Sequence, residues 1–258
     1  MPTGIGNGLA PQTFGQPLSN NSECPAAYCY EFDGISELGY VGGFIDIGVS
    51  DFSVSIWFKT PDVTGGGVDQ SLVGTKTFAG GQTWEIYLTT VGKVAFKSTA
   101  PGWNDTFASF TPTNDTWHHV VYSVDRSGNA TWYGDGSTTQ VTDISTNTTN
   151  LYSAGAYGAL AGGFSASDKY EGKIADIAMW DIALSASQVS EYYLNTKAPN
   201  KLCANSALST WPNLTGWWRF SNPTGTFATP MPTYGSLSTF NFIMFSMDQA
   251  NVITDYPA

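Results

Sequence analysis

The chain has 258 residues, of which 41% are hydrophobic and only 12% are charged. It carries 21 Asp and Glu against 10 Lys and Arg, which gives a formal net charge of −11. Since no cluster of Lys and Arg is present, we expect no nucleic-acid partner bound through phosphates and no docking on an anionic membrane surface.

An N-terminal arm is expected over residues 1–27. This segment is rich in Gly, Pro, Asn and Gln and shows no periodicity, a composition typical of segments that become ordered only against a partner. Strand signals begin at Tyr28. The stretch FSVSIWFK at 52–59 places its apolar residues at every second position. This alternation predicts a β-strand with one face toward a core.

Further strands are expected about every ten to twelve residues. TWEIYLTT and KVAFKST flank a hairpin turn at Val91-Gly92, and WHHVVYSVD alternates again before the return strand NATWYG. Asp135-Gly136 is a strong hairpin signal, because both central positions of a type I′ turn need a positive φ. Short strands that recur without intervening helices predict an all-β antiparallel sandwich.

One short helix is expected in LSASQVSEYYLN, at residues 184–195. Ser185 is a suitable N-cap, and Gln188 three residues later completes a capping box. The chain then changes character: LTGWWRF predicts a strand, and the apolar tail should be buried on its own domain or on a neighbouring subunit. We therefore expect an arm (1–27), a sandwich domain (28–197) and a C-terminal extension (198–258).

Several stretches, taken in order, resemble the concanavalin A-like, laminin G-like jelly-roll family. They are FDGISELGYVGGFIDIG, FSVSIWFKT, DTWHHVVYSVDRSGNATWYGDG with its DG hairpin, and YEGKIADIAMWDIALSASQVSEYY. The resemblance covers roughly residues 28 to 196 and implies a sandwich of two antiparallel sheets with one short helix. Because lectins, glycanases, adhesins and structural modules share this fold, the fold does not by itself give the function.

The C-terminal extension resembles the ends of virion proteins of tailed phages, especially aquatic phages of the cyanophage type. Their pattern runs "WWRmgd", then "tNM", then "dIvtDvP". Phe220-Ser221-Asn222 departs from the usual Met-Gly-Asp, and Tyr256 stands where Val is common. The matching residues are Trp217, Trp218, Arg219, Met247, Val252, Asp255 and Pro257.

Catalytic motifs are not found in the sequence. Glycanases on this fold need paired carboxylates that point into one cleft, and their E-x-D-x-x-E pattern does not occur. The nearest approach, Asp176 and Asp181, has an odd spacing that places the two carboxylates on opposite faces of a strand. Since G-x-S-x-G, H-E-x-x-H and P-loop patterns are also missing, we expect no enzymatic activity.

The two histidines of the chain, His118 and His119, are adjacent in a predicted strand. Neighbouring strand residues point to opposite faces, so the pair cannot bind one metal ion or serve one catalytic site without a bulge. The family resemblance implies that one ring packs inside and the other lies nearer the surface.

Calcium is the one metal that the sequence favours. Asp33 of FDG and Asp176 of the G-x-I-D strand match positions where related jelly rolls often hold a structural Ca²⁺. Two carboxylates with backbone carbonyls would suit this hard cation. The alternative is that both side chains cap turns.

Glycan binding would use exposed aromatic residues. Trp103, in the loop PGWND, is the best candidate, and Trp57 and Trp84 occupy outward strand positions in the predicted register. The alternative is that these rings cover sheet faces or face neighbouring subunits.

These observations lead to two functional hypotheses. The first is a virion structural protein, a capsid decoration or cement protein or a fibre component, located in the virion. Its arms would bind the major capsid protein or other virion subunits, and it would form a homo-oligomer. The N-terminus lacks the basic start and apolar centre of a signal peptide, which fits release inside a particle. The alternative is a carbohydrate-binding adhesin that recognises host surface glycans, with or without Ca²⁺.

Overall fold

The computed structural model describes residues 29–42, 47–76, 84–103, 105–151, 157–162, 168–196, 209 and 211–218. It also gives the strand paths at 233–234, 243–245 and 252–253. The expected arm at 1–27 lies outside the described residues, as does most of the extension at 198–258.

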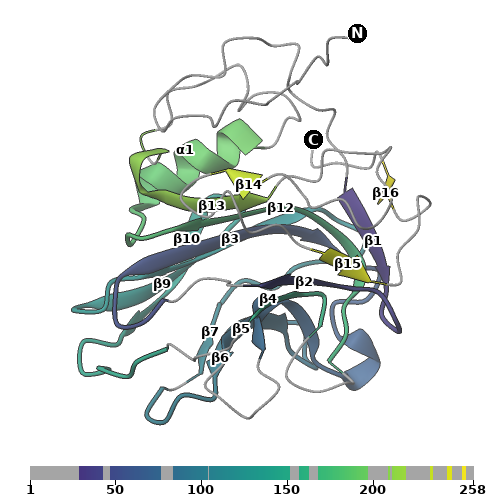
Figure 1. The fold of residues 1–258 in the computed structure, drawn as a ribbon, viewed down its shortest axis with the longest axis horizontal. Coiled ribbons are helices and arrows are strands. Elements are labelled where there is room, and N and C mark those ends of the chain that lie inside the picture. Colours follow the sequence, from purple (N-terminus) through teal and green to yellow (C-terminus); the bar gives the residue numbers. More distant parts are fainter. Residues whose placement is uncertain are drawn as a thin grey trace, which may run out of the picture.

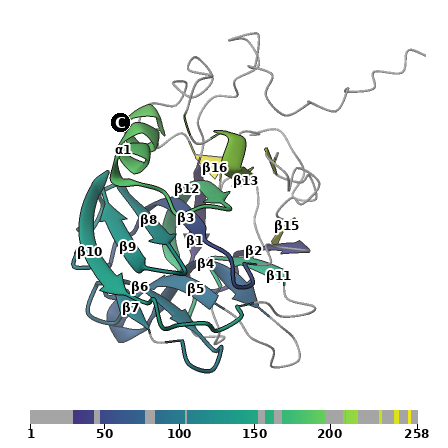
Figure 2. The same cartoon turned by 90° about the vertical axis from the view of Figure 1, so that its left-hand side faces the viewer.

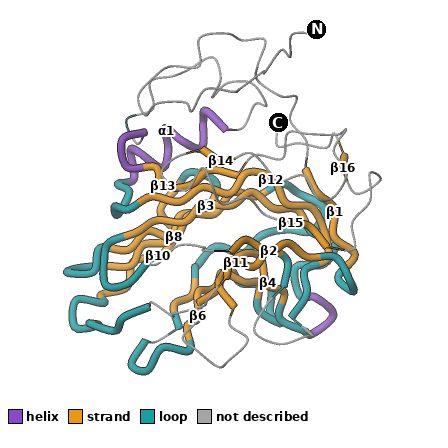
Figure 3. The backbone as a smooth tube through the Cα atoms, viewed as in Figure 1, coloured by secondary structure: helices purple, strands orange, loops and turns teal. Residues whose placement is uncertain are grey.

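Two antiparallel sheets lie face to face as the two layers of a sandwich (Figures 1 and 3). The all-β prediction is thus confirmed. The nine-stranded layer, here called sheet A, contains β10 (Ser137–Asp143), β9 (Asn129–Gly134), β8 (His118–Val124), β3 (Phe52–Lys59), β12 (Glu171–Trp180), β1 (Cys29–Asp33) and β16 (Val252–Ile253), in this order, with β13 (Leu214–Trp218) beside β12 and β14 (Thr233–Tyr234) beside β13. The seven-stranded layer, sheet B, has the order β15 (Ile243–Phe245), β2 (Leu38–Gly42), β11 (Tyr157–Leu160), β4 (Gln70–Lys76), β5 (Trp84–Leu88), β6 (Val94–Ser98) and β7 (Thr106–Phe107).

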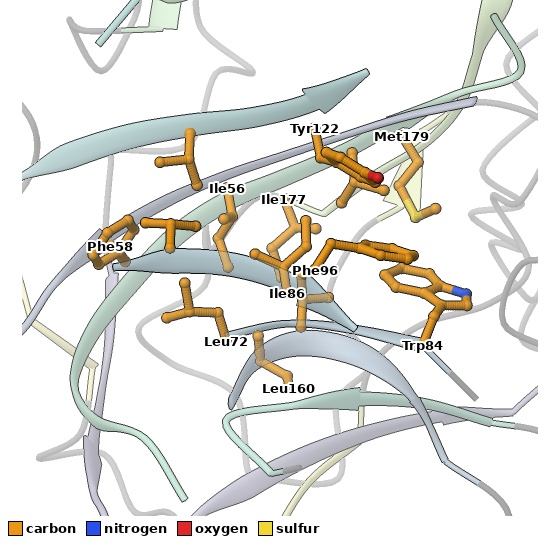
Figure 4. Packing of buried hydrophobic residues seen from close by; sticks show 14 of the residues in the cluster. Ile56, Phe58, Leu72, Trp84, Ile86, Phe96, Tyr122, Leu160, Ile177 and Met179 are labelled. Carbon is orange, nitrogen blue, oxygen red and sulfur yellow. The ribbon is translucent and has the colours of Figure 1, made fainter. Parts of the chain in front are cut away.

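The core fills the space between the two sheets. Ile56, Tyr122 and Met179 point inward from sheet A, and Ile86 and Phe96 point toward them from sheet B (Figure 4). The alternation predicted for 52–59 is confirmed, since Phe52, Val54, Ile56 and Phe58 belong to this cluster and the serines between them do not. The aromatic rings interlock here, for example Phe96 and Tyr122 with ring centroids 4.5 Å apart.

The helix α1 (Ala186–Thr196) covers the outer face of sheet A (Figures 1 and 2). The predicted capping box is present: the Ser185 N–H donates to Gln188 Oε1 at 2.9 Å, and the Gln188 N–H donates back to Ser185 Oγ at 3.4 Å. A second apolar cluster fills the contact between helix and sheet; it includes Trp180, Val189 and Trp217. Sheet A is therefore also covered on its outer face where α1 packs.

Strands of the C-terminal extension add to both sheets. β13 pairs with the second half of β12, while β16 pairs with β1 and β15 pairs with β2. Trp217 and Trp218 of the WWR motif lie in β13, and both are buried. Packing within this chain therefore explains why these two positions of the motif are tryptophan, without a contact to a neighbouring subunit.

Two turns show why particular residues are needed. Asp135 and Gly136 have φ of 47° and 79°, as the predicted type I′ turn requires. Gly74 of β4 lies beside a bulge at 71–73, where β5 approaches so closely that a Cβ on Gly74 would lie 2.3 Å from the Trp84 carbonyl oxygen. Two short 3₁₀ turns complete the described elements, at Gly65–Gly67 and Trp211–Asn213.

Candidate functional site

Trp57 does point outward from sheet A, as predicted, but helix α1 covers it. Its ring stacks on Tyr193 with centroids 5.5 Å apart and an interplanar angle of 14°. Its indole N–H donates to Thr196 Oγ1 at 3.1 Å. With 1% of its surface exposed, Trp57 cannot stack against a sugar. The prediction overlooked that the helix would occupy this face.

Trp84 and Trp103 are also buried, which corrects their prediction as glycan-binding residues. Trp84 lies two residues before Ile86 in β5, so both side chains point to the same side of the strand, into the core. There the Trp84 ring stacks on Phe96 with ring centroids 5.8 Å apart. Trp103 lies in a loop as expected, but its ring packs against Phe96 and lies under the Arg126 guanidinium, 4.8 Å from the ring centroid. The guanidinium also donates to the Thr149 carbonyl. Both indoles hold elements of the sandwich together.

The two histidines point to opposite faces of β8, as predicted. His118 donates from Nδ1 to Asp135 at 2.9 Å, and its Nε2 accepts the Thr113 N–H at 3.0 Å. His119 lies under helix α1 and is bonded through Nε2 to Ser55 Oγ at 2.7 Å. Burial lowers the pKa of His119 to about 3, although Asp135 opposes this in part. His119 is therefore neutral at ordinary pH, and the two rings form no common site.

Asp33 and Asp176 do not form one calcium site, because the sheet register separates them. Asp33 lies opposite Glu171, and Asp176 is five residues further along β12, about 17 Å at the usual strand rise. The Asp33 carboxylate accepts backbone N–H groups of residues 35–37. Burial favours the neutral form, but these donors lower the pKa of Asp33 to about 2. Asp33 thus caps a turn, which is the alternative to calcium binding that the sequence left open for this residue.

Asp176 is buried at a bulge of β12, with φ of 30°. Among the described residues, no group of three or more His, Cys, Asp or Glu is arranged to hold a metal ion. In the same part of the chain, no helix is long and apolar enough to span a membrane.

The outer face of sheet B, which points away from the core, is the candidate functional site. Trp84, Ile86 and Phe96 of β5 and β6 point into the core. Glu85, Tyr87 and Lys97 alternate with them and therefore point outward. The register places one row of side chains across this face, from β2 to β6: Tyr40, Ala159, Gly74, Glu85 and Lys97. Two small residues thus separate an aromatic end from a charged end.

The charged end is built around Lys97. Its Nζ lies 2.7 Å from Glu85 Oε1, 3.6 Å from Asp69 and 3.8 Å from Asp168. It also lies over the Tyr87 ring, 4.2 Å from the centroid. Burial lowers the pKa of Lys97, but the attraction of the three carboxylates outweighs this and raises the pKa above its ordinary value. Burial raises the pKa of Glu85, and Lys97 opposes that rise.

The aromatic end consists of Tyr40, Tyr157 and Lys76. The two tyrosine rings meet edge to face with centroids 4.9 Å apart, and Tyr157 lies directly opposite Lys76 in the register. All three side chains are half-buried. Exposed rims of tyrosine rings beside hydrogen-bonding groups suit ligands that combine apolar and polar surface, since aromatic residues supply contact area and a few polar groups fix orientation.

Sequence reasoning missed this face for a specific reason. It looked for tryptophans in loops, whereas the half-buried aromatics are tyrosines at outward positions of short strands. The signal was present in WEIYL and VAFKS, where Glu85, Tyr87 and Lys97 interrupt apolar residues at alternate positions. Tyr40 and Tyr157 lie 117 residues apart in the chain, and only the pairing of β2 with β11 brings them together.

Comparison with known proteins identifies the fold independently. The family model of the concanavalin A-like lectin/glucanases superfamily matches residues 41–190, which is more than half of the chain. No curated protein sequence matches.

Several solved structures are similar in fold at low sequence identity. A Bacteroides ovatus protein to which carbohydrate binding has been ascribed gives a TM-score of 0.59 at 12% identity, covering 85% of this chain and 58% of that chain. Domain 4 of AbnA, an extracellular arabinanase of Geobacillus stearothermophilus solved in complex with arabinotriose, gives 0.51 at 21% identity, covering 63% of this chain and 75% of that chain. The binding domain of botulinum neurotoxin serotype D gives 0.50 at 13% identity, with 66% and 42% covered. This chain thus spans less than two thirds of the Bacteroides and neurotoxin chains, and the likeness concerns the fold alone.

Proposed function

We propose that this chain, which belongs to the concanavalin A-like lectin/glucanases superfamily, binds carbohydrate without cleaving it and does so on the outer face of sheet B. The observation that carries the proposal is the combination on one sheet face of the Tyr40–Tyr157 pair and the polar network around Lys97. Sugar rings present apolar faces to aromatic side chains and hydroxyls to charged ones, which this face would supply together.

The comparisons support this proposal at the level of the fold. The arabinanase domain with a similar fold was solved with a bound trisaccharide, and carbohydrate binding has been ascribed to the Bacteroides protein. The sugar and the site in this chain are our inference from its own residues.

A glycan array probed with the full chain, in calcium and in EDTA, tests the proposal. Binding to at least one glycan should weaken about tenfold in the variant Tyr157→Ala, the cost expected when a well-placed aromatic contact is lost. The control Leu194→Ala removes an exposed side chain of α1, on the opposite side of sheet A, and should bind as the wild type does. Absence of binding to every glycan, with and without calcium, would refute the proposal, and release of reducing sugar would refute its non-catalytic part.

A second proposal is a structural role in a phage virion, as a decoration, cement or fibre protein that contacts the major capsid protein or other virion subunits. Its support is the sequence pattern of the extension, while the described strands of that extension pair within the chain itself. Residues 1–27 are then the segment expected to bind a neighbouring subunit. Loss of particle association on deleting 1–27, with glycan binding retained, would support this role, and unchanged association would contradict it.

A further inference from the structure

Two lysines lie on the outer face of sheet B in very different surroundings. Lys97 has three carboxylates within 4 Å of its Nζ. Lys76 is half-buried as well, yet no described carboxylate lies within that distance. Glu85 and Asp168 act on Lys76 only at longer range, while each has an oxygen within 4 Å of the Lys97 Nζ. Lys76 is therefore a half-buried cation whose charge is not paired within the described chain.

An unpaired cation at a half-buried position is costly to the folded chain. A charged ammonium is less well solvated at a half-buried position than in water. Burial accordingly lowers the pKa of Lys76, and attraction to the more distant Glu85 and Asp168 carboxylates opposes this only in part. Unpaired, partly desolvated charges of this kind are more frequent at functional sites than elsewhere, because a ligand of opposite charge compensates them on binding.

The position of Lys76 links it to the aromatic end of the face. Tyr157 faces it directly across the β4–β11 pairing, and Tyr40 contacts Tyr157 from β2. A ring that packs against the tyrosines would therefore place a substituent near Lys76, whereas Gly74, Ala159 and Glu85 in the middle of this face are buried. The face is thus asymmetric, cationic at one end and rich in carboxylates at the other.

We propose that the outer face of sheet B binds a carboxylate-bearing sugar, a residue of the uronic or sialic acid type, and that Lys76 holds its carboxylate. This inference rests on the proposed function and narrows it to one ligand class. An ammonium–carboxylate contact is a charge-assisted hydrogen bond, stronger than a neutral one. A compact ammonium suits this single contact, whereas Lys97 is engaged by the carboxylates of the chain.

A glycan array in which each core is present both with and without its uronic or sialic acid tests the inference. We expect the full chain to bind the acidic member of a pair about tenfold more tightly. Lys76→Met should abolish the preference, so that the acidic and the neutral member of each pair bind equally tightly. Lys76→Arg should keep part of the preference. The control Lys93→Met removes an exposed lysine next to the β5–β6 turn and should keep all of it.

The outcomes separate the two proposals. If neutral glycans bind as well as their acidic partners, or if Lys76→Met leaves the preference intact, the role of Lys76 is refuted while carbohydrate binding stands. If no glycan binds, both proposals fail. A preference that persists undiminished in 1 M NaCl would also contradict the inference, since the screening length there is about 3 Å and contacts between partly exposed charges weaken.

Discussion

Replacing His119 by glutamine should make the stability of the protein less sensitive to acid. The His119 ring is fully buried between β8 and α1, with Trp57 at 4.8 Å and Tyr193 at 5.6 Å between ring centroids. Its pKa falls to about 3 because burial penalises the charged ring. In the unfolded chain the pKa of histidine is about 6.5.

The sign and size of the effect follow from proton linkage. Below pH 6.5 the unfolded chain takes up a proton on this ring, whereas the folded chain does not until about pH 3. Acid therefore stabilises the unfolded state, and the folded state loses about 2 kcal/mol from this group between pH 7 and pH 5, and about 3 kcal/mol by pH 4. Carboxylates with lowered pKa values, such as Asp33, add to the acid sensitivity of both proteins.

Urea denaturation at pH 7, 6, 5 and 4 measures this contribution as a difference between two proteins. His119→Gln keeps a group able to bond Ser55 and removes the titrating ring. Because the ring contacts with Trp57 and Tyr193 are also lost, the variant should be less stable than the wild type at pH 7. The gap in unfolding free energy should narrow by about 2 kcal/mol at pH 5. A gap that stays constant from pH 7 to pH 4, with unchanged denaturant dependence, would refute the assignment of His119 as a buried neutral ring.

Two further predictions concern the outer face of sheet B. Gly74→Ala should lower the unfolding free energy by about 2 kcal/mol, since its Cβ would overlap the Trp84 carbonyl. Gly162→Ala, whose Cβ would meet nothing closer than 3.7 Å, should be nearly neutral in the same urea assay, and equal losses would contradict the close approach of β5. Lys97→Met should cost about 2 kcal/mol at pH 8, because it leaves the buried Glu85 carboxylate without its ammonium. This loss should shrink at pH 5, where Glu85 can be protonated, and a loss that does not change with pH would contradict the pairing.

The sequence predicted those parts of the fold that depend on local patterns. The alternation in FSVSIWFK, the Asp135-Gly136 turn and the capping box of Ser185 and Gln188 each rest on residues a few positions apart, and each is found in the structure. The separation of His118 from His119 also followed from strand geometry alone. In each case the conformation is determined by residues that are close together in the sequence.

The site could not be predicted in the same way, because it depends on which elements cover each other. Trp57 was correctly placed on the outward side of its strand, yet whether that side meets solvent depends on where α1 packs. Asp33 and Asp176 lie on strands β1 and β12, which are paired, and only the register shows that they are too far apart to share an ion. The burial of a side chain and the register between strands depend on how the whole sandwich assembles, so short sequence patterns do not predict them.

The C-terminal extension links the two functional proposals through one strand. β15 pairs with β2, and Ile243 lies opposite Tyr40 in that pairing. β2 is therefore held between β11 and β15, so the orientation of Tyr40 toward Tyr157 depends on a segment more than 200 residues further along the chain. Removal of β15 would leave β2 as an edge strand with unpaired backbone groups. A truncation of the extension would thus disturb the proposed glycan-binding face as well as any contact with a particle, whereas residues 1–27 contain none of the described strands. For this reason the N-terminal deletion discriminates between the two functions, and the C-terminal truncation does not.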